Sequence, residues 1–199
     1  MTHDPTQAAP RTVLHVGCGA PGPHKLPADF FPAGAWREVR LDIDPEVAPD
    51  ILASITEMSV VADGSADAVY SAHNLEHLHA HEVPLALREF HRVLRPDGFV
   101  LVTVPDLQRA ATLIAEDRLE EPAYASPAGP ISALDMVYGF GRAIEAGNGY
   151  MAHRTGFTAR TLEGALRTAG FPIVRVIRDD RFALWATAWR VEGGVALAA

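Results

Sequence analysis

The chain has 199 residues, of which 48% are hydrophobic and 21% are charged, and this ordinary globular composition excludes the disordered and fibrous classes. The length suits one domain with a single core. A formal net charge of −8 argues against the broad positive field that binding to duplex DNA or to an anionic membrane usually needs. Cys18 is the only cysteine, which excludes an internal disulfide and a cysteine zinc cluster.

The first ten residues are polar and rich in proline and alanine. We expect residues 1–10 to form a disordered leader, followed by a single domain over 11–199. The start lacks the basic and apolar segments of a secretory signal, and apolar stretches such as 99–102 are too short to span a membrane. The expected location is the cytoplasm, without membrane binding.

Short apolar runs alternate with helical patterns in the first half of the chain. The firmest helix covers 82–94, where apolar residues recur at helical spacing before a turn at 95–98. Five strands are predicted at 12–16, 38–42, 50–53, 67–71 and 99–104. Strands that alternate with crossovers indicate an α/β sheet with right-handed connections.

The second half continues this pattern less regularly. Two helical patches, at about 106–119 and 131–146, flank a proline-rich break. Thr158 is a suitable N-cap for a helix that Gly170 closes. Two final strands, 173–177 and 182–189, are joined by so short a link that they must pair antiparallel.

In such a sheet a ligand binds beyond the carboxyl ends of the strands, where the strand order reverses. A glycine-rich segment follows the first predicted strand, and Gly17 and Gly19 permit a tight turn and a close approach of ligand to backbone. Asp42 ends the second strand, where a carboxylate can accept hydrogen bonds from both hydroxyls of a ribose. The same sequence pattern would also arise if Asp42 were an exposed aspartate in a turn.

Four segments occur in order along the first half of the chain: VLHVGCG at 13–19, LDIDP at 41–45, SAHNLEHL at 71–78 and LREFHRVLRPDGFVLVTVP at 87–105. Together they resemble the successive motifs of class I S-adenosylmethionine-dependent methyltransferases. The resemblance implies a Rossmann-like α/β fold, with a seven-stranded, mostly parallel sheet, a C-terminal antiparallel hairpin and helices on both faces. It also implies S-adenosyl-L-methionine as the cofactor, and it specifies no substrate.

The resemblance assigns roles to particular residues. Asp42 would hold the ribose diol, and Ile43 would pack against the adenine. Three positions depart from the family pattern: His15 stands where an acidic residue is usual, Pro21 where glycine is usual, and Ser54 where aspartate is frequent. The residues that the resemblance places at the cofactor are His15, Gly17, Cys18, Gly19, Asp42, Ile43, Ser54, Ile55, Ala72 and His73.

Methyl transfer from a sulfonium depends mainly on alignment, and it needs a base only where the nucleophile arrives protonated. His73 and His153 are the catalytic candidates because imidazole titrates near neutrality. The same sequence pattern would arise if His73 were only a histidine at a strand end, hydrogen-bonded to the backbone. We expect residues 105–157 to cap the active site, although their aromatic residues could equally form the cap's own core. The candidate substrate contacts are Tyr138, Tyr150, His153 and Arg154.

Four histidines, His73, His77, His79 and His81, lie close together in the sequence. His73 and His77 would share one face of a helix, as metal ligands do. The proline at position 84 interrupts that pattern, so we expect a solvated polar turn and no bound metal.

The segment 71–74 lacks the Asn/Asp-Pro-Pro-aromatic pattern associated with amino methylation of bases or glutamine. Together with the charge of −8, this argues against a nucleic-acid acceptor. The expected acceptor is a small molecule or a glycan, as for small-molecule methyltransferases of bacterial type. The sequence leaves the oligomeric state open, with a homodimer as one option.

Two other functions stay open. One is an NAD(P)-dependent oxidoreductase, and the other is a methyltransferase-like binding module without catalysis, which the departures at His15, Pro21 and Ser54 motivate. A dinucleotide site places its pyrophosphate on the helix that follows the glycines. The proline-broken stretch 21–32 disfavours that helix and therefore the oxidoreductase.

Overall fold

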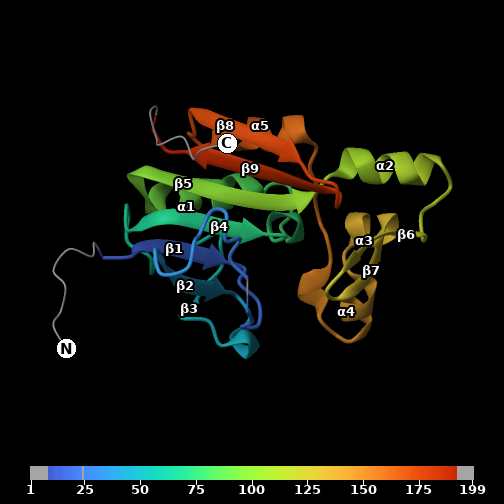
Figure 1. Cartoon of the computed structure of the whole chain (residues 1–199), viewed down its shortest axis with the longest axis horizontal. Helices are drawn as coiled ribbons and strands as arrows, with labels where there is room; N and C mark the ends of the chain where they lie inside the picture. The colour runs from blue at the N-terminus through green and yellow to red at the C-terminus, as the bar shows by residue number, and fades with distance from the viewer. Residues whose placement is uncertain (1–8, 24, 192–199) are drawn as a thin grey trace.

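The computed structural model of the chain describes residues 9–23 and 25–191. Seven strands form one sheet in the order β3-β2-β1-β4-β5-β9-β8 (Figure 1). Neighbours from β3 to β5 are parallel, and β9 pairs antiparallel with both β5 and β8. The strands are β1 (Arg11–Val16), β2 (Trp36–Asp42), β3 (Ile51–Leu52), β4 (Ala66–Ala72), β5 (Leu94–Pro105), β8 (Ile173–Arg178) and β9 (Ala183–Trp189). The predicted seven-stranded, mostly parallel sheet with its C-terminal antiparallel hairpin is confirmed.

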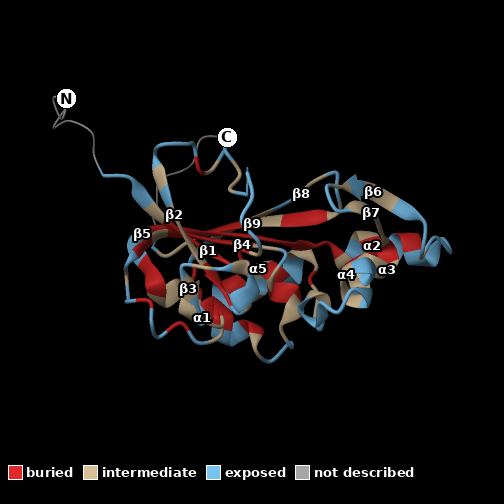
Figure 2. Cartoon of the chain, turned by 90° about the horizontal axis from the view of Figure 1, so that it is seen from below, coloured by how far each residue is buried: buried red, intermediate tan, exposed pale blue. Residues whose placement is uncertain are grey.

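Two helices, α1 (Val83–Val93) and α5 (Ala159–Thr168), cover the same face of the sheet (Figure 2). Their apolar stripes are fully buried against the strands, and a completely buried leucine or phenylalanine contributes about 1.5–3 kcal/mol. Thr158 is the N-cap of α5, as predicted, because its hydroxyl accepts a hydrogen bond from the Thr161 amide at 3.3 Å. Gly170 follows the helix with a φ of 107°.

The opposite face of the sheet is covered by a loop. The ring of Phe31 packs against Trp36, Tyr70 and Phe99 at centroid distances of 5.1, 5.7 and 6.0 Å. Among the described residues no helix contributes to this cluster, so the expected helices on both faces are found on one face only. The four prolines between positions 21 and 32 remove backbone donors and fix φ, and this prevents a helix while aromatic side chains bury the face.

The part of the chain between β5 and α5 lies at the carboxyl ends of the parallel strands (Figure 1). The two predicted helical patches correspond to three short helices in the structure: α2 (Leu107–Ala115), α3 (Ala133–Tyr138) and α4 (Gly141–Glu145). Between them the proline-rich break forms an antiparallel hairpin that was not predicted from the sequence, β6 (Pro122–Ser126) and β7 (Gly129–Ser132). Three short 3-10 helices complete the elements of the described residues: η1 (Pro45–Val47), η2 (Leu75–His77) and η3 (Gly149–Met151).

One smaller expectation differs from the structure, and another cannot be compared with it. The strand β5 begins at Leu94, directly after α1, and therefore includes the residues 95–98 that were expected to form a separate turn. Most of the leader, residues 1–8, lies outside the described residues. None of the described helices has the length and apolar character needed to cross a membrane.

Candidate functional site

A cavity of about 270 Å³ opens at the carboxyl ends of β1, β2 and β4. The chain runs from β1 to β2 on one side and returns to β4 on the other, so the cavity lies where the strand order reverses, the usual ligand position in open α/β sheets. We call it the cofactor cavity. Seven of the ten residues predicted to contact the cofactor line it: Gly17, Gly19, Asp42, Ile43, Ser54, Ile55 and His73.

The glycine loop after β1 is fixed by two cations on its outer side. Gly17 and Gly19 have φ angles of 60° and 59°, which are left-handed conformations that favour glycine. Lys25 Nζ donates to the Cys18 carbonyl at 2.8 Å, and Arg40 donates to the Gly19 carbonyl at 2.6 Å. Because these carbonyls are held from outside, the loop has a fixed shape beside the cavity.

Asp42 is 8% exposed and both of its carboxylate oxygens already hold the surrounding turns. Oδ2 accepts a hydrogen bond from the Gly19 amide at 2.8 Å, and Oδ1 accepts one from the Asp44 amide at 3.0 Å. A carboxylate has about four acceptor positions, so two remain for a ligand. This arrangement suits the predicted contact with a ribose diol.

Three of the predicted cofactor residues do not line this cavity. The His15 side chain lies on the face of β1 opposite to Leu14 and Val16, where Nδ1 is 2.6 Å from a Glu38 carboxylate oxygen. Burial lowers the pKa of His15 despite this contact with Glu38. The Cys18 thiol is buried, and burial raises its pKa. Ala72 packs against the aromatic cluster on the loop-covered face.

Asn74 received no predicted role, although it stands in the segment that follows β4. Its side chain lies against Gly17 and lines the cofactor cavity. The amide nitrogen Nδ2 is buried and has no hydrogen-bond partner among the described residues. A buried donor without a partner is costly, so Asn74 offers an N–H group that a ligand in the cavity would satisfy.

A second cavity, of about 410 Å³, lies beside the first and shares His73, His77 and Met151 with it. We call it the acceptor cavity. Its charged side chains are Glu76, Asp135, Asp179 and Arg181. Most of the lining is apolar or aromatic, and much of it comes from the β6–β7 hairpin, α3 and β9: Pro105, Tyr124, Ala125, Pro127, Ala128, Ile131, Met136, Phe140, Met151, Ala183 and Trp185.

The residues predicted to contact the substrate fall in different places. His153 lines the acceptor cavity, whereas Tyr150 and Arg154 line the cofactor cavity. Tyr138 lines neither cavity and is 65% exposed. Tyr138 is the last residue of α3, and the buried side of this helix carries Met136 instead. The position of Tyr138 therefore does not support its predicted contact with the substrate.

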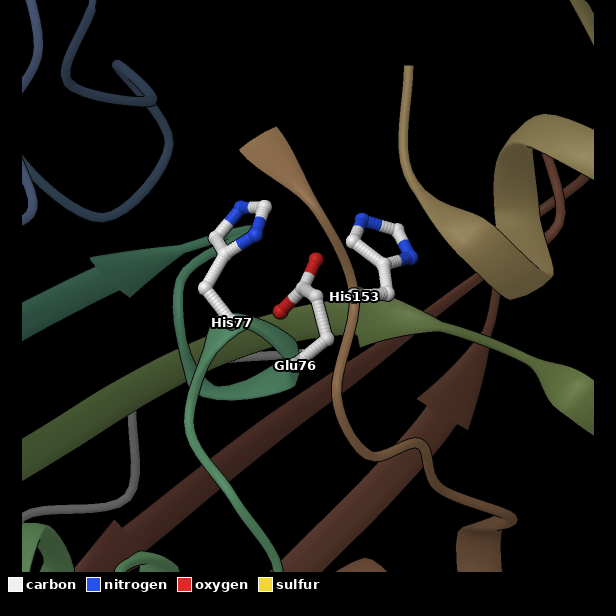
Figure 3. A group of neighbouring side chains, drawn as sticks. All are labelled: Glu76, His77 and His153. Atoms are coloured by element: carbon white, nitrogen blue, oxygen red, sulfur yellow. The ribbon is translucent and has the colours of Figure 1, made fainter. Parts of the chain in front are cut away.

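The wall between the two cavities contains Glu76 and three histidines. His73 has a φ of 47°, a strained conformation for a residue other than glycine, and its Nδ1 lies 3.3 Å from Glu76 Oε1. Figure 3 shows the Glu76 carboxylate between the rings of His77 and His153, whose centroids are 5.0 Å apart. Neither Glu76 nor the pairing of His77 with His153 was predicted from the sequence, since about 75 residues separate these segments.

The electrostatic effects within this wall oppose one another. Burial disfavours the ionised form of Glu76, but the three neighbouring histidines outweigh it and hold its pKa below the usual range. Burial would lower the pKa of His73, but Glu76 outweighs that effect and raises it. For His153 burial dominates, and its pKa is lowered.

Residues 14–102 match the family described as Methyltransferase domain. The match covers slightly less than half of the chain, and over these residues the chain is similar to a methyltransferase domain. No curated protein matches the chain.

Solved structures share the fold of this chain at low sequence identity. One is the 1,6-didemethyltoxoflavin-N1-methyltransferase of Burkholderia thailandensis with bound 1,6-didemethyltoxoflavin and S-adenosylhomocysteine, at 20% identity and a TM-score of 0.57, covering 90% of this chain and 70% of that one. A second is a methyltransferase from Methanosarcina mazei, at 15% identity and a TM-score of 0.58, covering 94% and 95%. A third, from Aquifex aeolicus, has 15% identity and a TM-score of 0.56, covering 91% and 82%.

Proposed function

We propose that the methyltransferase domain transfers the methyl group of S-adenosylmethionine to a small, largely apolar molecule bound in the acceptor cavity. The observation that carries this proposal is the contact between the two cavities, which share His73, His77 and Met151. A cofactor held by the glycine loop and Asp42 would have an acceptor in the neighbouring cavity as its nearest partner. Methyl transfer then depends mainly on the alignment of nucleophile, methyl carbon and sulfur.

The lining of the acceptor cavity favours a small apolar acceptor over a glycan. Tyr124, Phe140 and Trp185 supply aromatic surface, and the polar groups of the cavity form the smaller part of its lining, while a glycan needs many hydrogen-bonding groups to replace its hydration. A volume of about 410 Å³ falls within the range of small-molecule sites. The Burkholderia relative of similar fold was solved with a small molecule, 1,6-didemethyltoxoflavin.

In the proposed reaction a lone pair on the acceptor forms a bond to the methyl carbon. The carbon–sulfur bond breaks, and its electrons pass to the sulfur to give S-adenosylhomocysteine. His73 stands between the cavities and His153 lines the acceptor cavity, so both remain candidates for contact with the acceptor. The segment 105–157 supplies most of that cavity, in agreement with its proposed role as a cap.

Two measurements test the proposal. Calorimetric titration compares S-adenosylhomocysteine with NAD, and we expect binding of the former only. Labelled methyl transfer into a fractionated metabolite extract then identifies the acceptor class, with Asp42→Ala as the variant that should lose transfer. We expect the label in a small apolar fraction.

Other outcomes would overturn specific parts of the proposal. Label in a glycan fraction would refute the acceptor class. S-adenosylhomocysteine binding without any transfer would indicate a binding module that has no catalysis. Binding of NAD alone would favour an oxidoreductase.

A further inference from the structure

Glu76 has a buried carboxylate that is surrounded by histidine rings and, among the described residues, makes no hydrogen bond of full geometry. Its side chain is 1% exposed, and neither carboxylate oxygen has a hydrogen-bond partner within the described part of the chain. The nearest ring nitrogen, His73 Nδ1, lies 3.3 Å from Oε1. A buried carboxylate costs several kcal/mol unless a cation or several donors compensate it.

His77 and His153 place ring nitrogens around this carboxylate. One ligand atom from each of Glu76, His77 and His153 lies within 4.8 Å of the other two. His153 Nδ1 donates to the Met136 carbonyl at 3.0 Å when it carries the proton, which leaves a lone pair on Nε2. Backbone carbonyls that fix one ring nitrogen in this way commonly orient the other toward a metal.

Both ring nitrogens of His77 face backbone carbonyl oxygens. Its Nδ1 lies 3.2 Å from the Ala152 carbonyl, and its Nε2 lies 3.1 Å from the His73 carbonyl. A neutral imidazole donates only one hydrogen bond, so one lone pair then faces a carbonyl oxygen. The ring must turn away from that carbonyl before the nitrogen can bind an ion.

The two segments that supply these side chains are already joined by the backbone. The amides of Arg154 and Thr155 donate to the Glu76 carbonyl at 2.8 and 3.2 Å. Glu76 and His77 come from η2, and His153 follows η3, so the group is assembled by tertiary structure. Ligands on preassembled elements lose little conformational freedom when an ion binds.

We propose that Glu76, His77 and His153 bind a divalent first-row transition-metal ion. Two imidazoles and one carboxylate suit zinc, iron or cobalt, whereas magnesium and calcium prefer oxygen ligands. Zinc–nitrogen bonds of about 2.0–2.1 Å place the ligand atoms of a tetrahedral site about 3.3 Å apart. The three side chains must therefore move slightly inward on binding. This proposal departs from the sequence-based expectation of no metal.

All three side chains line the acceptor cavity, so the open positions of such an ion face the place where the acceptor is expected. There the ion would hold an acceptor through an oxygen or nitrogen atom. This role rests on the proposed function, whereas binding of the ion itself does not.

The histidines nearest in sequence provide a matched control. His79 and His81 stack on each other at 5.7 Å and do not belong to the group. The probe is cobalt(II), whose visible absorption reports the coordination number, and zinc(II) is then used to displace it. The wild-type protein is expected to bind one equivalent of cobalt, and magnesium is expected to leave the spectrum unchanged.

We expect Glu76→Gln and His153→Asn each to weaken cobalt binding by at least about tenfold, because loss of even an outer partner of a metal ligand weakens a site by roughly 10–100-fold. The double variant H79N/H81N should bind cobalt like the wild type. Circular dichroism and S-adenosylhomocysteine titration on the same variants show that each is folded. Cobalt binding lost only in H79N/H81N, or no stoichiometric binding by the wild type, would overturn the proposal. A wild type that binds S-adenosylhomocysteine but no metal would leave the proposed function standing.

Discussion

The side chain of Asn74 lies directly over Gly17, so close that a Cβ on the glycine would be 2.5 Å from Asn74 Nδ2 and 2.6 Å from Oδ1. Gly17 follows β1 directly, and Asn74 follows β4, so the contact joins two neighbouring strands at their carboxyl ends. Both residues line the cofactor cavity. The absence of a side chain at position 17 therefore allows the two segments to meet there.

This contact predicts the effect of Gly17→Ala. A positive φ costs a residue other than glycine about 1–2 kcal/mol, and displacing the Asn74 side chain adds about 1–3 kcal/mol. Gly34→Ala is the matched control, since Gly34 has a φ of 81° but no atom lies within 4 Å of the place where its Cβ would stand. Urea unfolding should show the larger loss of stability for Gly17→Ala, together with weaker S-adenosylhomocysteine binding. Equal losses in both variants would contradict the role of the Asn74 contact.

The strands and helices that bury a regular apolar pattern were predictable from the sequence. The helix at 83–93 was found to within one residue because apolar side chains recur along its buried face and a proline stands near its start. Thr158 and Gly170 marked the limits of α5 by capping chemistry, which acts locally. Such signals come from the segment itself and need no knowledge of the rest of the fold.

Features that depend on distant segments were not predictable in the same way. The hairpin β6–β7 forms in a proline-rich stretch without alternating apolar residues, and its partner surface comes from α2 and α3. Phe31 covers a face of the sheet that was expected to carry a helix. The group of Glu76, His77 and His153 forms only after η2 and the segment following η3 come together. The position of each of these residues is decided by tertiary packing.

Asp42 provides a second prediction. Asp42→Ala should weaken S-adenosylhomocysteine binding by about 1–3 kcal/mol, because two hydrogen bonds to a charged group are expected to be lost along with support for the Gly19 amide. Asp42→Asn keeps one acceptor oxygen and should lose less. Calorimetric titration measures both. Asp50→Asn is the control, since Asp50 is exposed, accepts a hydrogen bond from the Arg40 amide and does not line the cavity. An affinity unchanged in a folded Asp42→Ala protein would refute the ribose contact.

The separation of the two cavities gives a third prediction. Ala128 is exposed in the turn of the β6–β7 hairpin and lines the acceptor cavity only, so Ala128→Trp should obstruct the acceptor without touching the cofactor. We expect labelled methyl transfer to fall by about tenfold or more, as loss of about 1.4 kcal/mol of acceptor binding requires. S-adenosylhomocysteine affinity should stay at the wild-type value.

Ala111→Trp is the control for this substitution, because Ala111 is exposed on α2 and lines neither cavity. It introduces the same side chain on the same part of the chain and should leave transfer unchanged. If both tryptophan variants lose transfer equally, the effect comes from the bulk of the side chain and the assignment of the acceptor cavity fails.

The dependence of stability on pH gives a fourth prediction, at a histidine that lines neither cavity. His91 lies on α1 with its ring 5.1 Å from that of Phe171. Burial lowers the pKa of His91 below 6.5, and the nearby Arg190 acts in the same direction. In the unfolded chain His91 keeps its ordinary pKa, so below about pH 6.5 the unfolded state binds more protons than the folded state. The free energy of unfolding should therefore fall as the pH decreases through this range.

His91→Gln cannot titrate and should remove this contribution. Urea midpoints at several pH values between about 5 and 8 should give a shallower acid limb for His91→Gln than for the wild type, while the two proteins should run parallel above about pH 7. The difference between the two curves cancels the contributions of all other residues. His81→Gln carries the same substitution at an exposed position and is measured in parallel. Curves for His91→Gln and wild type that stay parallel across the whole range would show that burial of His91 does not link folding to protonation.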